Sequence, residues 1–293
     1  MAPGRTPQRA ALLDTNHGPL RFGDRCLIMG VLNVTPDSFS DGGRFLEPAA
    51  AVAHAHRMVA EGADLIDIGG ESTRPGSRPV PAEEQMRRVL PAIEEMRRRG
   101  ITLPISIDTR NALVAEAAIS AGADLVNDVS AARHDPHMPS LLARLGIPCV
   151  LMHMQGTPET MQKSPSYADV VEEVLRFFEA RIAALSADGV PPDRVVVDPG
   201  IGFGKTLEHN LSLLRAVPRF AARWPLLIGG SRKRFIGELL NQPDPSGRLM
   251  GTAAVTAFCA LAGADMVRVH DVGEMRQIVE VCRQLRGASA LPA

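Results

Sequence analysis

The chain has 293 residues, of which 45% are hydrophobic and 22% are charged, and its formal net charge is −1. This length and composition suffice for a large buried core, while the nearly neutral charge excludes broad, non-specific binding of nucleic acid. No apolar run approaches the length of a membrane span, so no integral membrane protein is expected.

The amino-terminal segment Met1–Gln8 is polar and proline-rich, and it lacks the apolar stretch of a secretory signal peptide. We expect a flexible tail over residues 1–18, with a short cleaved targeting peptide as the alternative. Four cysteines are scattered without the spacing of metal ligands: Cys26, Cys149, Cys259 and Cys282. Reduced thiols of this kind are typical of a cytoplasmic protein, which is the location that we expect.

Eight short apolar segments are predicted as strands, and each is followed by polar residues that can take part in binding or catalysis. In chain order the segments are Ile28–Leu32, Leu65–Ile68, Ile105–Ile107, Leu125–Val126, Cys149–Met152, Val195–Val197, Leu226–Ile228 and Met266–Val267. The segments with helical periodicity are Ala49–Glu61, Pro81–Arg99, Asn111–Ala121, Pro139–Leu145, Tyr167–Asp188, His209–Val217, Arg248–Ala262 and Val272–Leu285.

The alternation of strand and helix predicts a parallel sheet with right-handed crossovers. The tripeptide Gly-Ala-Asp recurs at 62–64, 122–124 and 263–265, each time where a helix turns directly into the next strand. The connections after the strands are longer and rich in Gly, Pro, Ser and Thr. This asymmetry is typical of an α/β fold of the TIM-barrel class, in which the active site lies at the carboxyl ends of the strands.

We therefore expect one domain, a (β/α)8 barrel over residues 19–288, followed by a tail over residues 289–293. An open, doubly wound sheet is the alternative architecture, but such a sheet usually needs only five or six strands.

Three polar residues at strand ends are candidates for binding a heterocycle. Asp108 and Asp198 each follow a predicted strand, and Asn127 follows another. An aspartate in this place is often only the N-cap of the next helix. The alternative is that buried carboxylates accept paired hydrogen bonds from a planar ring rich in N–H groups, while the amide adds a donor and an acceptor. A guanine-like or pterin-like ring would fit this set.

Residues that can bind an anion follow the first, second, seventh and eighth strands: Asn33, Thr73, Arg74, Ser231, Arg232, Lys233, Arg268 and His270. The last two barrel loops often hold phosphate, and the segment 229–231 leads towards a helix whose first N–H groups attract anions. Arg268 and His270 are two residues apart in a strand and should share its barrel-facing side. For Arg232 a solvated charge on the next helix is the favoured alternative.

Two long polar loops, Thr35–Gly43 and Glu71–Pro79, are expected to act as lids or substrate clamps. The segment Gly200–Thr206 is not interpreted as a P-loop, because its glycines and lysine do not stand at the required positions. His153 and Met152 close a strand, and they either pack the top of the barrel or line a ring pocket.

Eight segments, spread in order over about residues 26 to 272, resemble the conserved segments of bacterial dihydropteroate synthases, which belong to the pterin-binding family of folate biosynthesis. They are 30–43, 67–76, 106–109, 127–129, 151–158, 198–205, 231–233 and 268–272. The resemblance implies a transferase that joins p-aminobenzoate to 6-hydroxymethyl-7,8-dihydropterin diphosphate, giving 7,8-dihydropteroate and diphosphate.

The resemblance also implies the roles of individual residues. The pterin site would comprise Asp108, Asn127, Met152, Asp198, Phe203, Gly229, Lys233 and Arg268. The diphosphate site would comprise Asn33, Thr73, Arg268 and His270, with Mg²⁺ bound through Asn33. The p-aminobenzoate site would comprise Phe39, Thr73, Arg74, Pro75 and Ser231. The residues expected to carry catalysis are Asp108, Lys233, Arg268 and Asn33.

The chemistry of these residues suits that reaction. Breaking the methylene C–O bond leaves positive charge that the dihydropterin ring can delocalise and the Asp108 carboxylate can stabilise. Mg²⁺, Arg268 and His270 would stabilise the departing diphosphate. The arylamine is nucleophilic at neutral pH, so no dedicated general base is needed. Gly230, where many relatives carry a bulkier residue, is a small departure from the family.

Two other functions fit parts of the pattern. A corrinoid-dependent, pterin-binding methyltransferase would share the barrel but would need neither the two long loops nor a diphosphate site. A non-catalytic paralogue would keep the pocket and lose the reaction. The family commonly forms homodimers and is the target of sulfonamides, which mimic p-aminobenzoate. A homodimer is therefore expected here, with Val255, Phe258, Cys259 and Leu261 as candidate contacts that core packing explains equally well.

Overall fold

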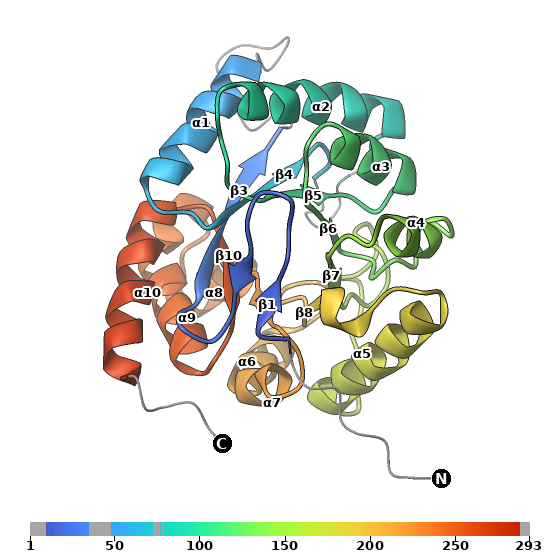
Figure 1. The fold of residues 1–293 in the computed structure, drawn as a ribbon. Helices are drawn as coiled ribbons and strands as arrows, with labels where there is room; N and C mark the ends of the chain where they lie inside the picture. Colours follow the sequence, from blue (N-terminus) through green and yellow to red (C-terminus); the bar gives the residue numbers. More distant parts are fainter. Residues whose placement is uncertain (1–9, 35–47, 73–76, 78, 288–293) are drawn as a thin grey trace.

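The computed structural model describes residues 10–34, 48–72, 77 and 79–287 (Figure 1). At its centre lie eight parallel strands: β3 (Leu27–Asn33), β4 (Leu65–Gly69), β5 (Ile105–Asp108), β6 (Leu125–Asp128), β7 (Cys149–Met152), β8 (Val195–Asp198), β9 (Leu227–Ile228) and β10 (Met266–Val269). They pair in the order β8-β7-β6-β5-β4-β3-β10-β9, and a bridge between Val197 and Leu226 closes the sheet. The predicted single-domain (β/α)8 barrel is confirmed.

The helices surround this barrel. They are α1 (Pro48–Ala60), α2 (Ala82–Arg98), α3 (Ala112–Ser120), α4 (Met138–Leu145), α5 (Val170–Ala187), α6 (Leu207–Arg215), α7 (Val217–Ala221), α8 (Arg234–Leu240), α9 (Leu249–Leu261) and α10 (Val272–Arg286). Periodicity does not reveal α7 and α8, because they have only five and seven residues. In the described part of the chain, no helix has both the length and the apolarity to cross a membrane.

Side-chain caps decide where two of the predicted helices begin. The Asn111 side chain accepts hydrogen bonds from the N–H groups of Leu113 and Val114, so α3 starts just after it. Asp169 caps α5 in the same way, and this helix begins three residues later than its periodicity predicts. A capping residue has non-helical backbone angles, so it lies outside the helix that it stabilises.

Alternate residues of the strands face the barrel interior and the surrounding helices. The interior contains an apolar layer made of Leu27, Met29, Leu65, Leu125, Val150, Val196, Leu227 and Met266. Their neighbours on the strands, such as Ile28, Ile66 and Val126, belong to the larger core shared with the helices. The strands are therefore buried on both faces, which explains why they appear in the sequence as continuous apolar runs.

A short hairpin packs against the interior apolar layer. It pairs β1 (Leu12–Leu13) with β2 (Leu20–Arg21), and the side chains of Leu13, Leu20 and Phe22 belong to the same cluster as that layer. Leu13 is fully buried. The flexible tail predicted over residues 1–18 is therefore wrong for residues 10–18. Residues 1–9 and the predicted tail at 289–293 lie outside the described residues.

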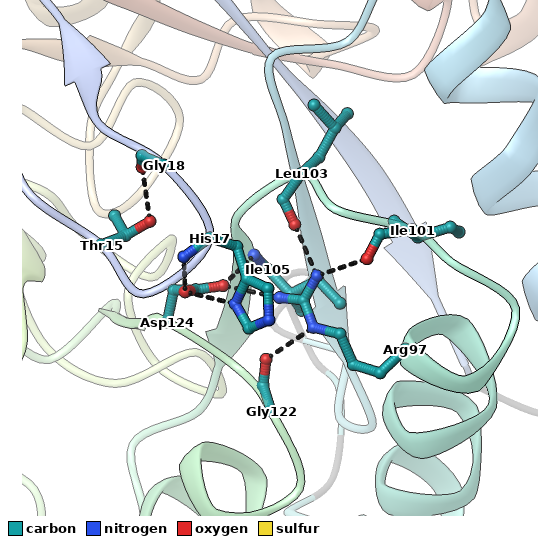
Figure 2. Close-up of polar contacts among 9 residues, drawn as sticks. All are labelled: Thr15, His17, Gly18, Arg97, Ile101, Leu103, Ile105, Gly122 and Asp124. Carbon is teal, nitrogen blue, oxygen red and sulfur yellow. Dashed lines mark hydrogen bonds and ion pairs between the residues drawn. The ribbon is translucent and has the colours of Figure 1, made fainter.

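Asp124 holds the turn of this hairpin against the start of β5 (Figure 2). Its Oδ1 accepts the backbone N–H of His17 at 3.1 Å and lies 2.9 Å from the ring Nδ1 of the same residue. Its Oδ2 accepts from Arg97 at 2.7 Å and from the Ile105 N–H at 2.8 Å. Arg97 also donates to three backbone carbonyls, those of Gly122, Ile101 and Leu103. Because Asp124 is 1% exposed, this network holds a charge inside the protein.

The three Gly-Ala-Asp repeats share one structural role. The Asp64 N–H donates to the Ile28 carbonyl, and the Ile28 N–H donates back to Asp64 Oδ2, both at 2.8 Å. The same reciprocal pair joins Asp124 to Ile105 and Asp265 to Leu226. Each aspartate therefore supplies hydrogen-bond partners to a neighbouring strand where the parallel ladder begins.

Candidate active site

The predicted site residues converge on one pocket at the carboxyl ends of the strands. The space between their side chains, with the open mouth included, is about 440 Å³. Its lining residues are Asp108, Asn127, Val129, Met152, Asp198, Phe203, Gly229, Ser231, Lys233, Arg268 and His270. Val129 is the one lining residue that the sequence analysis does not single out.

The two-residue period of the strands explains this convergence. Five of the pocket residues lie in a strand or directly after it, two positions beyond a member of the interior apolar layer, and they face the same way one level higher: Asn127, Met152, Asp198, Gly229 and Arg268. Arg268 and His270 both line the pocket, as their spacing predicts. The apolar side chains of the interior layer thus fill the barrel, and the side chains two residues further along the strands line the pocket.

Arg268 lies between two carboxylates. Its Nε donates to Asp67 Oδ2 at 2.6 Å, and its Nη2 donates to Asp108 Oδ2 at 2.9 Å. Burial opposes the charge of the guanidinium, but the two carboxylates outweigh burial, and the pKa of Arg268 is raised. Arg268 therefore presents a permanent cation to the pocket.

Asp108 titrates close to neutral pH. Burial raises the pKa of its carboxyl to about 7. Arg268 opposes this shift, while the negative charges of Asp67, Glu71 and Asp128 add to it. A strongly shifted group with a defined charge partner inside a pocket is typical of functional sites.

Asp67 is a site residue that the sequence analysis misses. It is fully buried, and the same oxygen that accepts from Arg268 accepts from Asn127 Nδ2 at 3.1 Å. The available signal is an aspartate inside the apolar run Leu65–Ile68, where every second residue of a barrel strand points inward.

Asp198 provides the third carboxylate of the site. Its Oδ1 accepts the Gly200 N–H at 2.7 Å. Burial raises the pKa of Asp198, although this hydrogen bond and the nearby cations lower it in part. A methyl group on Gly229 would lie 3.7 Å from Asp198 Oδ2, so the glycine keeps the space beside this oxygen open.

One wall of the pocket is apolar. Met152 and Phe203 belong to a cluster that is separate from the main core and that also contains Val129, Met154 and Met161. The Lys233 ammonium lies 4.0 Å from the centre of the Phe203 ring, which is a cation–π contact. An apolar wall edged by carboxylates, an amide and an ammonium group suits a flat heterocycle.

Lys205 lies buried behind this wall, and the sequence analysis assigns it no role. Its Nζ donates to the Phe203 carbonyl at 2.9 Å and to the His153 carbonyl at 3.3 Å, and it lies 3.1 Å from His153 Nδ1. Burial lowers the pKa of Lys205 to about 7. Burial and the neighbouring charge of Lys205 lower the pKa of His153 to about 2. His153 is therefore a neutral partner of Lys205, and it does not line the pocket.

Ser231 and His270 form the side of the pocket predicted to bind an anion. Ser231 Oγ lies 3.0 Å from His270 Nδ1 and accepts the His270 N–H at 3.3 Å. Burial lowers the pKa of His270 to about 3, and the neighbouring arginines contribute. His270 thus offers a neutral hydrogen-bonding ring. Arg232, interpreted as a solvated charge on the next helix, instead lies just before α8 and is ion-paired with Asp271. It is not among the described residues that line the pocket.

Several predicted residues lie elsewhere. Asn33 ends β3 and is partly exposed, but it is not among the described residues that line the pocket. Four predicted residues, Phe39, Thr73, Arg74 and Pro75, lie outside the described residues. So does most of the two predicted loops. At the base of the second loop, buried Glu71 accepts the Val80 N–H at 3.1 Å and two bonds from Arg110 at 3.2 Å.

Comparison with known proteins shows the family of this chain. Residues 29–270 match the family model described as "Pterin binding enzyme". The chain is 47% identical over 265 residues to the dihydropteroate synthase of Synechocystis sp., covering 90% of this chain and 91% of the relative. The structure of Xanthomonas albilineans dihydropteroate synthase with 4-aminobenzoic acid is 45% identical and superposes with a TM-score of 0.88, covering 97% of this chain and all of that one. The same enzyme in complex with 7,8-dihydropteroate is 44% identical with a TM-score of 0.81, covering 92% and 95% of the two chains.

Proposed function

The chain belongs to the pterin-binding enzymes and is a dihydropteroate synthase, and from this premise we propose which of its residues carry each part of the reaction. The observation that supports the assignment best is the composition of the pocket at the carboxyl ends of the barrel strands. Three aspartates or amides, a lysine and an arginine surround one apolar wall there. The related synthase in complex with 7,8-dihydropteroate supports a pterin compound as a ligand, and we propose this pocket as its binding site.

The pterin ring is held by the groups at the ends of β5, β6 and β8. Ionised carboxylates of Asp108 and Asp198 accept hydrogen bonds from the N–H groups of the ring, and Asn127 adds an amide. Met152 and Phe203 contact the face of the ring, while Lys233, already against Phe203, donates to an acceptor on its edge. Gly229 leaves room for the ring beside Asp198.

The reaction exchanges one bond of the methylene carbon for another. The C–O bond breaks with its electron pair going to the diphosphate, and the arylamine nitrogen forms the new C–N bond and then loses a proton to solvent. Asp108 stabilises the positive charge that the pterin carries between these events, because a fixed carboxylate in a site of low polarity needs no reorganisation. Arg268 lies next to Asp108 and offers its remaining N–H groups to the leaving diphosphate.

His270 is assigned to the diphosphate site as a neutral donor, together with Asn33 at the end of β3 and Thr73. No group of three or more His, Cys, Asp or Glu side chains in the described residues could hold a metal ion. Mg²⁺, however, usually needs only one or two protein oxygens when a substrate phosphate supplies others, and Asn33 at the end of β3 fits that requirement. When bound, the ion would neutralise charge on the diphosphate.

The p-aminobenzoate site is assigned to Phe39, Thr73, Arg74, Pro75 and Ser231. Of these, Ser231 lines the described pocket, so the site would lie at its mouth on the side of β9. Arylamine and methylene carbon would then meet in a fixed orientation, which supplies much of the rate enhancement in a reaction between two substrates.

The test is diphosphate release by the purified protein mixed with dihydropterin diphosphate, Mg²⁺ and p-aminobenzoate. We expect release that depends on the arylamine, with 7,8-dihydropteroate formed in equal amount. Pterin binding without release would contradict the assignment and leave a non-catalytic pterin-binding protein.

We also propose that two copies associate through α8, α9 and α10. Large apolar side chains are exposed on these adjacent helices: Leu239, Leu240, Met250, Phe258, Leu261, Val281 and Leu285. Among the candidate contacts predicted from the sequence, Phe258 and Leu261 are exposed, whereas Cys259 is fully buried and belongs to the core. A homodimer by analytical ultracentrifugation that becomes a monomer in Phe258→Asp would support this surface, and a monomeric wild-type protein would exclude it.

We also propose a cytoplasmic location, in keeping with the four buried, free cysteines.

A further inference from the structure

Asp67 occupies an unusual position for a charged residue. It lies in the middle of β4, its side chain is fully buried, and its neighbours along the strand, Ile66 and Ile68, belong to the apolar core. One carboxylate oxygen, Oδ2, accepts two hydrogen bonds, from Arg268 Nε and Asn127 Nδ2. The other oxygen, Oδ1, is buried and has no hydrogen-bond partner in the part of the chain that the structure describes. A buried charge without full compensation is costly, so a role beyond packing has to be considered.

The contact with Arg268 restricts the direction of the guanidinium. This group is planar and carries five N–H donors in a fixed arrangement. One donor, on Nε, is bound by Asp67, and one on Nη2 is bound by Asp108. With one edge fixed by two carboxylates from neighbouring strands, the plane of the guanidinium is set. Both hydrogens on Nη1 and one on Nη2 remain for a ligand.

The contact with Asn127 restricts the direction of its amide. An ionised carboxylate can only accept hydrogen bonds, so the NH₂ side of Asn127 must face Asp67. The amide oxygen of Asn127 then turns away from Asp67, and Asn127 lines the pocket. An amide free to flip would present either an acceptor or a donor to a bound ring. Asp67 removes that choice.

We propose that Asp67 is a positioning residue, which holds the guanidinium of Arg268 and the amide of Asn127 in the orientations that the pterin diphosphate requires. This inference rests on the proposed function. It adds to that function a residue that lies below the pocket and acts only through its two partners.

Asp67 also contributes to the electrostatics of Asp108. Its negative charge is one of the influences that raise the pKa of Asp108. The charged groups that act on Asp108 come from four neighbouring segments: Arg268 of β10, Asp67 of β4, Glu71 after β4 and Asp128 of β6. Removing the charge of Asp67 while Arg268 stays beside Asp108 must therefore lower the pKa of Asp108.

Two variants separate geometry from charge. Asp67→Ala removes both hydrogen bonds, and we expect the dissociation constant for 6-hydroxymethyl-7,8-dihydropterin, measured by titration calorimetry, to rise about tenfold or more. Asp67→Asn keeps an acceptor oxygen for both donors, so its dissociation constant should stay close to that of the wild type. The matched control is Ser106→Ala. Ser106 is the register partner of Asp67 on β5, and it is equally buried and without a hydrogen-bond partner among the described residues, so its loss should leave binding unchanged.

The pH dependence of kcat/KM provides a readout that a merely structural residue would not move. In Asp67→Asn the acid limb of this profile should shift to lower pH, because Asp108 has lost a negative neighbour. Wild-type affinity in Asp67→Ala, or an unmoved acid limb in Asp67→Asn, would overturn the inference. The calorimetric arm needs no turnover. If the wild-type protein binds the pterin without reacting, the proposed function is contradicted. The role of Asp67 in pterin binding can still be measured in that case.

Discussion

Replacing Asp108 by asparagine tests the central element of the proposed mechanism. The substitution keeps the shape of the side chain and an acceptor for Arg268 Nη2, but it removes the negative charge. The pterin carries its full positive charge only near the transition state. The loss should therefore appear in kcat much more than in pterin binding.

The magnitude follows from the loss of the charge. Two unit charges about 4 Å apart attract by about 4 kcal/mol at an effective dielectric constant of about 20. Losing that attraction corresponds to a decrease of about a thousandfold in kcat. Binding should change only a few-fold, because the amide oxygen of the asparagine can still accept a hydrogen bond from the ring.

Single-turnover kinetics and titration calorimetry give the two quantities separately. A pH series adds a second check. In the wild type, kcat/KM should fall as the pH falls through about 7, because protonation removes the charge of Asp108, whereas in Asp108→Asn this acid limb should be absent. His270 does not produce the limb, since its pKa is near 3. Equal losses in affinity and turnover would refute the cation-stabilising role.

Three further substitutions probe the surroundings of the site. Lys205→Met removes a buried amine that donates to the carbonyls of the pocket wall and, when protonated, lowers the pKa of Asp198. Calorimetry should show about tenfold weaker pterin binding. Unchanged affinity would exclude this support. Gly200→Ala would bring a methyl group within 2.0 Å of the His153 carbonyl at φ +70°, and it should destabilise the fold by about 3 kcal/mol or more in urea unfolding. Its control, Gly146→Ala, has φ +61° and open space, and it should cost about 1 kcal/mol. Asp124→Ala removes the carboxylate that binds Arg97 and two backbone N–H groups, and it should lower the free energy of unfolding by about 3–5 kcal/mol. A decrease below about 1 kcal/mol would contradict the role described for Asp124.

Most of the pocket could be predicted because, in a barrel of parallel strands, a residue's place relative to its strand fixes the end of the barrel at which it lies. Residues that follow a parallel strand meet at one end of the barrel, so Asp108, Asn127, Asp198, Arg268 and His270 can be grouped without knowing any contact. The spacing of Arg268 and His270 further fixes their common side. Hydrophobic periodicity supplies the strands and the longer helices for the same reason, since each strand is buried on both faces.

Other features depend on contacts between distant segments and could not be found in this way. The hairpin of β1 and β2 has only two residues in each strand, and its stability comes from packing Leu13 and Phe22 into the barrel. Lys205 stands in a glycine-rich turn, and its burial follows from the fold of that turn against His153. Asp67 lies between apolar residues in the middle of a strand, so it is missed when candidate site residues are sought only at the ends of strands.

The hairpin that fills the lower end of the barrel also has a kinetic consequence. Leu13, Leu20 and Phe22 pack against the interior layer, so among the described residues this end of the barrel is filled, and the pocket opens at the other end, beside the carboxyl ends of the strands. Substrates, diphosphate and product would then share this opening. The pterin, which is proposed to lie deeper in the pocket, would have to enter before p-aminobenzoate, which is proposed to lie at the mouth. A one-ended pocket of this kind favours an ordered kinetic mechanism, in which any molecule seated at the mouth traps the one beneath it.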